Sequence, residues 1–238
     1  MKGPASMTID SEAVKKFWLA RGRKSLRHES AANLEEDPQL LKLKVHAEKE
    51  MILPRLDLSS DIDILDLGCG NGQWSLRFAP CVRSVTGVDF SESMLAAGRR
   101  KASELGLRNI QFVESPVEEY NPDRKWGLIF ISGVFIYLND DQAKKTAKIV
   151  SNALADDGYV FLRDAASLLP NRYILDNVWS PALGANYSAI YRTVQEYKDL
   201  FSGYGLSCVE DGDMFPQGSP LNKHSETRLR YYQFARYN

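Results

Sequence analysis

A glycine-rich turn follows the first strand-like segment of the sequence, in the stretch ILDLGCGNGQW from Ile64 to Trp74. Gly68, Gly70 and Gly72 alternate with other residues directly after an apolar run. Glycines between a strand and a helix leave backbone N–H groups free at the start of the helix, and they let a ligand approach the main chain closely. The turn therefore predicts an α/β protein with a ligand site at this point.

The spacing of the glycines separates the ligands that such turns bind. A dinucleotide turn is typically G-x-G-x-x-G, but here the pattern is G-x-G-x-G and position 73 is Gln. A phosphate-binding loop ends in Gly-Lys-Ser/Thr, and this turn has no lysine. Asp66, just before the glycines, would repel a pyrophosphate and suits a ligand that carries an ammonium and a sulfonium.

The rest of the chain alternates strand and helix patterns. Strands are expected at 62–67, 85–89, 110–114, 126–132 and 159–164, and helices at 92–105 and 140–154, the second capped by Asp140. Residues 10–20 and 40–53 have helical patterns before the first strand, and a Thr193/Glu196 capping box starts a helix at 193–201. Strands at 206–210 and 229–235 would close the sheet as an antiparallel pair. The pattern predicts a doubly wound, seven-stranded, mostly parallel sheet with a helical N-terminal cap.

The composition narrows the class of protein. The chain has 238 residues, 30 basic and 31 acidic, and a net charge of −1, so we expect no nucleic-acid partner. Its three cysteines have neither zinc nor disulfide spacing, and no apolar run approaches the roughly 18 residues of a membrane span. We expect a cytoplasmic protein without membrane contact, either a monomer or a homodimer.

The glycine turn and three later segments resemble class I methyltransferases, which use S-adenosylmethionine. Motif I of that family, E/D-x-G-x-G-x-G, is matched by Asp66 and the three glycines. VTGVDFS resembles the second-strand motif, WGLIFISGVFIYLND the fourth-strand segment, and LADDGYVFLRDA the segment leading into the fifth strand. The resemblance implies that Asp89 binds the ribose hydroxyls, since a carboxylate at the carboxyl end of a strand accepts two hydrogen bonds.

The resemblance also assigns the remaining cofactor contacts. Phe90 would border the adenine, and the family's adenine-binding acid falls on Pro116, which has neither an N–H nor a polar side chain. The adenine would then depend on the Val117 N–H, the Ser115 hydroxyl or Glu118. We also expect Arg21 or Arg23 to reach the cofactor carboxylate if the N-terminal segment closes. The other residues expected at the cofactor are Cys69, Trp74, Met94, Ser132 and Trp18.

The methyl acceptor is less well signalled. The sequence lacks the Asn/Asp-Pro-Pro-Tyr/Phe tetrapeptide of base and amide methyltransferases, the Pro-Cys of cytosine-C5 enzymes, and the clustered acids of metal-dependent enzymes, so no metal is expected. What remains resembles small-molecule N- and O-methyltransferases, in which a cap and an insertion after the fifth strand enclose the acceptor. The acceptor-side residues expected on this basis are Phe17, Phe135, Arg163, Trp179, Tyr187 and Tyr191.

These expectations divide the chain into four parts. They are a cap or lid at 1–58, the Rossmann-like cofactor core at 59–164, an acceptor-pocket insertion without clear period at 165–192, and the end of the sheet at 193–238. Tyr137, Asp164 and His28 are the candidate catalytic residues, because a hydroxyl acceptor usually needs a base. The expected function is SN2 transfer of a methyl group to nitrogen or oxygen of a small, aromatic or heteroaromatic metabolite. Methylation of a protein or peptide amine, or a catalytically silent cofactor-binding subunit, remain the alternatives.

Overall fold

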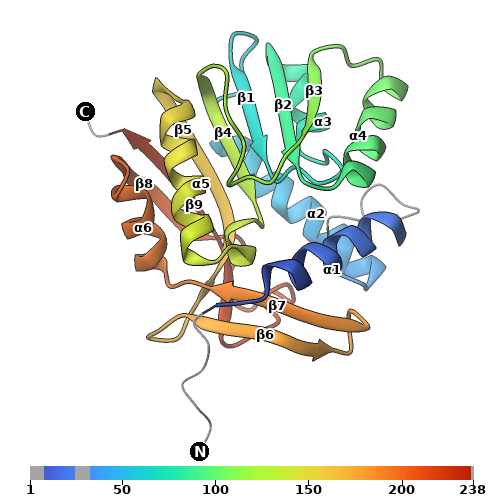
Figure 1. Cartoon of the computed structure of the whole chain (residues 1–238), viewed down its shortest axis with the longest axis vertical. Helices are drawn as coiled ribbons and strands as arrows, with labels where there is room; N and C mark the ends of the chain where they lie inside the picture. Colours follow the sequence, from blue (N-terminus) through green and yellow to red (C-terminus); the bar gives the residue numbers. More distant parts are fainter. Residues whose placement is uncertain (1–7, 25–32, 237–238) are drawn as a thin grey trace, which may run out of the picture.

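A computed structural model gives the structure of residues 8–24 and 33–236. Its main sheet has seven strands in the order β3-β2-β1-β4-β5-β9-β8, of which β9 runs antiparallel to both neighbours (Figure 1). The predicted fold class is confirmed. The strands are β1 (Asp63–Leu67), β2 (Ser84–Asp89), β3 (Ile110–Glu114), β4 (Trp126–Ser132), β5 (Leu154–Ser167), β8 (Leu206–Asp213) and β9 (Thr227–Arg236).

Helices cover both faces of this sheet. Two lie on one face, α5 (Asp140–Ala153) and α6 (Val194–Ser202), and their buried side chains form one apolar core with the strands. A second core on the opposite face includes side chains of α2 (Pro38–Ile52) and α3 (Ser75–Phe78), while α4 (Glu92–Glu104) lies beside β3. Short 3-10 turns complete the chain: η1 (Leu53–Arg55), η2 (Ala79–Cys81) and η3 (Phe135–Tyr137).

α5 begins at Asp140, as predicted, but its N-cap is the preceding residue. Asn139, not Asp140, is the N-cap, and it forms a capping box with Gln142. The Asn139 amide also accepts a hydrogen bond from the Ile9 N–H at 2.9 Å, which ties the N-terminal segment to this helix. Asp140, which does not cap the helix, forms ion pairs with Arg192 at 2.7 Å and Arg172 at 2.9 Å. The capping box predicted at Thr193 and Glu196 is confirmed.

Residues 165–192 are not the irregular insertion that the sequence suggested. β5 continues to Ser167, and the rest is largely a hairpin of β6 (Tyr173–Ser180) and β7 (Ala185–Tyr191). The alternation of β6 is broken by a register shift and by Asn177, whose φ is 56°. An irregularity of this kind removes the period of two by which a strand is recognised.

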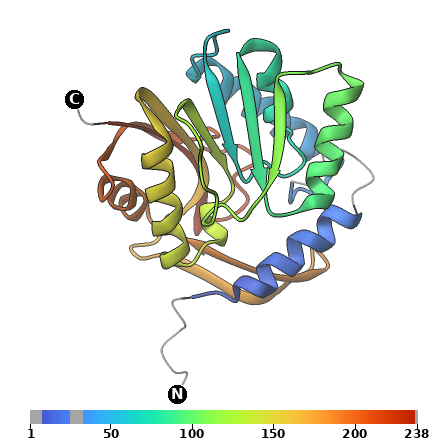
Figure 2. The same cartoon turned by 45° about the horizontal axis from the view of Figure 1, so that its top comes forward.

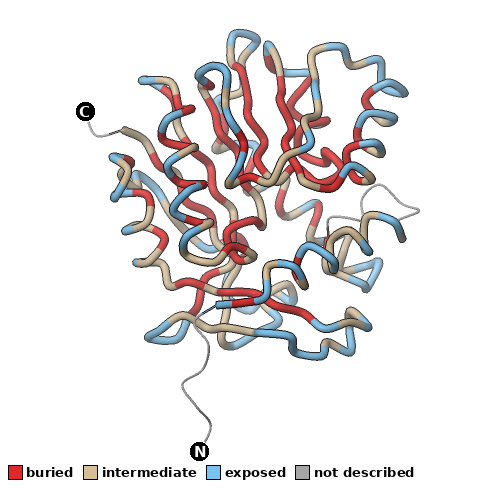
Figure 3. Tube along the Cα trace, in the orientation of Figure 1, coloured by how far each residue is buried: buried red, intermediate tan, exposed pale blue. Residues whose placement is uncertain are grey.

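The hairpin and helix α1 (Ser11–Lys24) together form a cap along the edge of the sheet where β1, β2 and β4 end (Figures 1 and 2). α1 contacts both β7 and α4, so it spans the width of this edge. Figure 3 shows continuous burial through the central strands and much more exposure along β6, where Trp179 is 61% exposed. The cap therefore buries its inner strand β7 and leaves β6 facing outward.

The side chain of Phe112 on β3 occupies space made by three glycines. A Cβ atom on Gly72 would lie 2.7 Å from the Phe112 ring, and a Cβ atom on Gly87 or Gly98 would lie 2.9 Å from it. Likewise, a Cβ atom on Gly68 would lie 2.3 Å from a methyl group of Val134. Two of the three motif glycines are thus required by packing as well as by their positive φ angles of 72° and 75°.

Substitution of Gly72 should destabilise the fold more than substitution of a glycine with the same backbone conformation in open space. Gly106 has φ of 67°, and a Cβ atom placed on it would have no neighbour within 4 Å, so Gly106→Ala should cost about 1–2 kcal/mol for the left-handed conformation alone. Gly72→Ala adds the clash with Phe112 and should cost about 1–3 kcal/mol more. Urea unfolding of both variants measures the difference, and equal losses would contradict the role given to Phe112.

Candidate cofactor and acceptor site

The carboxylate of Asp89 joins the two turns that follow β1 and β2. One oxygen accepts the Gly70 N–H at 2.9 Å and the other accepts the Ser91 N–H at 2.8 Å. The side chain is buried, and this burial raises the pKa of Asp89 to about 6. Asp89 therefore lies where the sequence placed it, at the carboxyl end of β2 and against the glycine turn.

Asp66 has an internal partner. Its carboxylate accepts the Ser75 hydroxyl at 2.5 Å and also the Ser75 N–H, so it holds the first residue of α3 behind the glycine turn. Burial raises the pKa of Asp66 to about 7. Asp66 is thus part of the structure that shapes the turn, a contribution that its place in the motif does not reveal.

The groups around Pro116 narrow the choice of an adenine contact. The Ser115 N–H donates to the Asp89 carbonyl at 3.0 Å, and the Ser115 hydroxyl donates to the Pro116 carbonyl at 2.9 Å. Glu118 accepts a hydrogen bond from Gln142 of α5 at 2.5 Å. Of the three groups that the sequence offered to the adenine, the Ser115 hydroxyl and one Glu118 oxygen thus have partners within the protein, and among the described residues no such bond is formed by the Val117 N–H.

The C-terminal half of α1 packs tightly on the start of α4. A Cβ atom on Gly22 would lie 2.7 Å from the Ser93 hydroxyl and 3.1 Å from the Met94 side chain. One turn earlier, the Trp18 ring contacts Tyr137 of η3 at a centroid distance of 5.2 Å. The Trp18 indole N–H is buried and has no hydrogen-bond acceptor among residues 8–24 and 33–236. This N–H group can therefore donate a hydrogen bond to a ligand or to a water molecule.

An aromatic cluster continues from α1 into the hairpin. Phe17 contacts Tyr187 at 5.8 Å between ring centroids, and the hydroxyl groups of Tyr137 and Tyr187 lie 3.0 Å apart. Burial raises the pKa values of Tyr137, Tyr187 and Tyr191. Three elements far apart in the sequence, α1, η3 and β7, therefore form one continuous aromatic wall over the ends of β4 and β5.

Asp164 is fully buried at the end of β5 and binds backbone. Its oxygens accept the Ala165 N–H at 2.9 Å and the Ile136 N–H at 3.3 Å, which ties the strand to η3. Burial raises the pKa of Asp164 to about 6. The geometry gives this carboxylate a clear positioning task, while its use as a base stays a prediction.

Other residues predicted for the site lie in different surroundings. Trp74 is buried against Phe130 at 5.3 Å and Phe78 at 5.8 Å, on the face covered by α2 and α3. Phe135 is fully buried against Phe201 at 5.4 Å. Both rings therefore contribute to the apolar cores of the fold, and their contact with a ligand stays a prediction.

The other residues that the sequence predicted for the site differ in how far they are exposed. Cys69 is buried in the glycine turn, whereas Phe90 and Ser132 are partly exposed at the ends of their strands. Arg23 is exposed on α1, and Trp179 faces outward from β6. His28 lies outside the described residues.

Arg163, which the sequence placed on the acceptor side, belongs to a charged cluster at the end of β5 whose other members, Lys44 and Glu48, the sequence reasoning missed. Arg163 pairs with Glu48 of α2, and one turn earlier on that helix Lys44 donates to the Asn33 side chain at 2.7 Å. The spacing of four residues places Lys44 and Glu48 on one face of a helix, a signal available in the sequence. Nothing in the sequence shows that this face meets Arg163.

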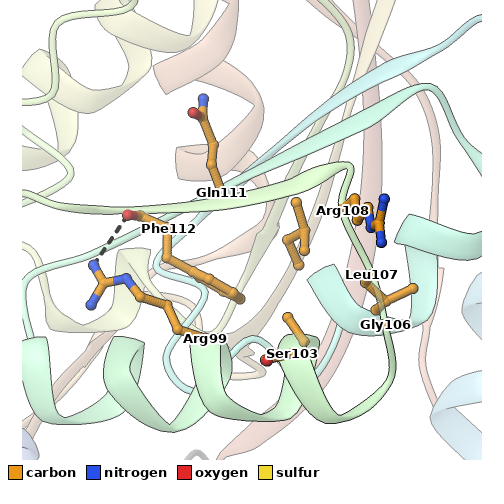
Figure 4. A pocket seen from close by; sticks show the side chains of 9 residues that line it. Arg99, Ser103, Gly106, Leu107, Arg108, Gln111 and Phe112 are labelled. Carbon is orange, nitrogen blue, oxygen red and sulfur yellow. Dashed lines mark hydrogen bonds between the residues drawn. The ribbon is translucent and has the colours of Figure 1, made fainter.

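A surface depression of about 620 Å³ lies between α4 and β3 (Figure 4). Arg99 crosses it to donate to the Phe112 carbonyl at 3.2 Å. None of the residues predicted for the cofactor or the acceptor lines it. It is separate from the candidate site and lies on the outer side of the Phe112 ring.

Comparison with known proteins agrees with this arrangement. Residues 64–158 match a family described as a methyltransferase domain. A 23S rRNA (uracil(1939)-C(5))-methyltransferase of Marinomonas posidonica is 31% identical over 169 residues, which is 71% of this chain and 32% of that protein. This chain spans between 32% and 49% of the lengths of this relative and two other curated methyltransferases.

Two solved structures share the fold over nearly the whole chain. The Haemonchus contortus phosphoethanolamine N-methyltransferase 1, in complex with phosphoethanolamine and S-adenosylhomocysteine, has a TM-score of 0.73 at 18% identity, covering 95% of this chain and 49% of that one. The complex of DhpI with SAH has a TM-score of 0.67 at 19% identity, covering 95% and 96%. Residues 64–158 therefore carry the pattern of a methyltransferase domain, on a fold that both solved structures share. Both of these structures are complexes with S-adenosylhomocysteine, which supports S-adenosylmethionine as the cofactor of this chain.

The residues of this methyltransferase domain fit the cofactor. Asp89 presents a buried carboxylate to hydroxyl groups, and the glycine turn keeps backbone beside it free of side chains. The buried indole N–H of Trp18 offers a further donor from the cap. Among the residues described, no group of three or more His, Cys, Asp or Glu side chains is arranged to hold a metal, and no helix is long and apolar enough to cross a membrane.

Cofactor binding should weaken in acid through Asp89. Because the pKa of Asp89 is raised to about 6, its carboxyl becomes protonated as the pH falls through that value, and it then accepts hydroxyl hydrogen bonds less well. Titration calorimetry with S-adenosylhomocysteine between pH 5 and pH 8 should show affinity falling below about pH 6. Asp89→Asn should bind S-adenosylhomocysteine about ten-fold or more weakly over the whole pH range, and its affinity should no longer fall below about pH 6. Asp66→Asn should retain this fall in affinity, and a fall that survives in Asp89→Asn would assign the titration elsewhere.

A larger side chain at Gly22 should hold the cap away from α4. Gly22→Val should lower the affinity for S-adenosylhomocysteine about ten-fold, because α1 can no longer approach Ser93 and Met94. Ala20→Val is the matched control, since Ala20 is exposed on the same helix. Equal affinities of the two variants would show that closure of α1 does not contribute to binding.

Proposed function

We propose that this protein transfers a methyl group from S-adenosylmethionine to a nitrogen or oxygen atom of a small, flat acceptor. The observation that carries the proposal is the aromatic wall formed by Phe17, Trp18, Tyr137 and Tyr187 over the ends of β4 and β5. Such a wall suits an aromatic or heteroaromatic acceptor and a sulfonium cation, and it excludes water. The solved N-methyltransferase with phosphoethanolamine is one relative in fold whose acceptor is a small molecule.

The chain's own residues would bind and orient the two reactants. S-adenosylmethionine, when bound, supplies an activated methyl group on a sulfonium. Asp89 would hold the ribose hydroxyls, the Val117 N–H the adenine, and the aromatic wall the acceptor beside it. In-line transfer depends mainly on this positioning, which supplies much of the rate enhancement in reactions between two bound substrates.

The surroundings of the candidate bases favour nitrogen as the atom methylated. The pKa of Tyr137 is raised by burial, and its hydroxyl forms a hydrogen bond with the Tyr187 hydroxyl, so Tyr137 remains protonated. Asp164 is fully buried, and its carboxylate holds η3 against β5 through the Ile136 and Ala165 N–H groups, which is a positioning task. A neutral amine or ring nitrogen offers its lone pair without a base, whereas a hydroxyl acceptor needs one.

Two rival functions make different demands on the surface. Methylation of a peptide amine would favour an open acidic groove, but the elements over the ends of β4 and β5 are aromatic and closed by α1. A silent cofactor-binding subunit would bind S-adenosylmethionine without turning it over. The net charge of −1 gives no general support for an RNA acceptor such as that named for the 23S rRNA relative.

Titration with S-adenosylmethionine, followed by turnover with a labelled methyl group, tests the proposal. We expect binding of S-adenosylmethionine and S-adenosylhomocysteine at about micromolar concentrations, and label transfer to members of a panel of heteroaromatic amines. Tyr187→Ala, which opens the wall, should reduce transfer about ten-fold or more and leave cofactor affinity within about two-fold. Transfer only to peptides, or binding without any transfer, would overturn the small-molecule assignment in favour of one of the rivals.

A further inference from the structure

The charged cluster of Lys44, Glu48 and Arg163 lies at the same edge of the sheet as the glycine turn. In the sheet register, Leu67 is level with Ile131, and Arg163 is level with the next residue, Ser132. The Arg163 guanidinium passes over the turn after β4, since a Cβ atom on Gly133 would lie 3.6 Å from it. The cluster therefore borders the ends of β4 and β5, which the aromatic wall covers from the other side.

The cluster contains more positive than negative charge. Glu48 is buried, with its side chain 4% exposed, and pairs with one nitrogen of Arg163, whose side chain is 12% exposed. A second nitrogen of Arg163 donates weakly to the Ser132 hydroxyl at 3.4 Å, and its Nε–H has no acceptor among residues 8–24 and 33–236. Lys44 has a neutral partner, Asn33. Within this cluster two cations accompany one carboxylate. The neighbouring Asp164 carboxylate, which the charge of Arg163 also stabilises, accepts the Ala165 and Ile136 N–H groups.

The nearby Glu35 does not remove this excess. It forms its own ion pair with Lys223 at 2.6 Å. Burying an uncompensated cation is costly, and an incoming anion relieves that cost. A planar guanidinium with free N–H groups is well suited to carboxylates and phosphates, which it binds through charge-assisted hydrogen bonds.

We propose that Lys44 and Arg163 bind an anionic group of the methyl acceptor, a phosphate or a carboxylate, with Glu48 holding Arg163 in position. This deepens the proposed function and rests on it, because it places an anionic acceptor between the cluster and the aromatic wall. The cluster selects for acceptors that combine a methylatable nitrogen with a negative charge.

The charge of Lys44 should make anion binding at the cluster depend on pH. Burial lowers the pKa of Lys44 to about 8, opposed by Glu48 on its own helix and by Glu35 and assisted by Arg163 and Lys223. Lys44 is therefore charged below about pH 8 and neutral above it. Binding of an anion should weaken as the pH rises through that value, and Lys44→Met should remove this dependence.

The test uses inorganic phosphate as probe and the whole protein, with and without S-adenosylhomocysteine. Phosphate should raise the melting temperature more than sodium chloride at the same ionic strength. Lys44→Met and Arg163→Gln should abolish the difference, whereas Glu48→Gln, which removes the competing carboxylate, should enlarge it. A buried ion pair with a purely structural role would instead lower the melting temperature of both Glu48→Gln and Arg163→Gln and leave no specific effect of phosphate in the wild-type protein.

A second measurement separates the acceptor from the cofactor as the source of the anion. The affinities for S-adenosylhomocysteine and for 5′-methylthioadenosine, which lacks the amino-acid carboxylate, are compared in the wild-type protein and in Arg163→Gln. The proposal expects both affinities to change by less than about two-fold, because the cluster does not touch the cofactor. A selective loss of S-adenosylhomocysteine binding, with methylthioadenosine unaffected, would assign the cluster to the cofactor carboxylate and overturn the proposal.

These readouts also distinguish failure of this proposal from failure of the proposed function. Phosphate binding by the unliganded protein does not depend on methyl transfer. A protein that binds S-adenosylhomocysteine and methylates only uncharged amines would retain its proposed function and refute an anionic acceptor. A protein that binds phosphate through Lys44 and Arg163 but no cofactor would refute the proposed function itself.

Discussion

The glycine turn after β1 is held in place by side chains that take the room its own side chains would need. The ring of Phe112 packs against Gly72 and a methyl group of Val134 packs against Gly68, so the turn is wedged between β3 and β4. Asp89 then fixes Gly70 by accepting its N–H. The positions of the glycine turn and of Asp89 depend on this packing, because the glycines have no side chains with which to hold the turn.

Local patterns made the core of the fold predictable. β3 and β4 begin and end at the residues expected from their apolar runs, and α4 and the Thr193 capping box follow local signals of the same kind. The hairpin of β6 and β7 was not predicted from the sequence, because Asn177 interrupts the alternation of β6. Its inner strand is stabilised by contacts with α1 and η3, which are distant in the sequence.

The candidate site also contains residues that local sequence motifs predict and residues that they do not. Asp89 and the glycines were recognisable because each belongs to a short local motif, the glycines to the turn after β1 and Asp89 to the end of β2. Trp74 and Phe135 stay predictions, since an aromatic residue beside a motif is equally suited to packing, and both rings contact core side chains. The meeting of Arg163 with Glu48 joins residues 115 positions apart, a separation over which sequence patterns carry no information.

Helix α1 contacts the start of α4 at one end and the hairpin strand β7 at the other. One rigid element thus covers both the cofactor end and the acceptor end of the sheet. If α1 moves as a unit, the two ends open together and close together. In the proposed reaction, exchange of S-adenosylhomocysteine and release of the methylated product would then be a single kinetic event, and the rate at which α1 leaves α4 would set an upper limit on turnover.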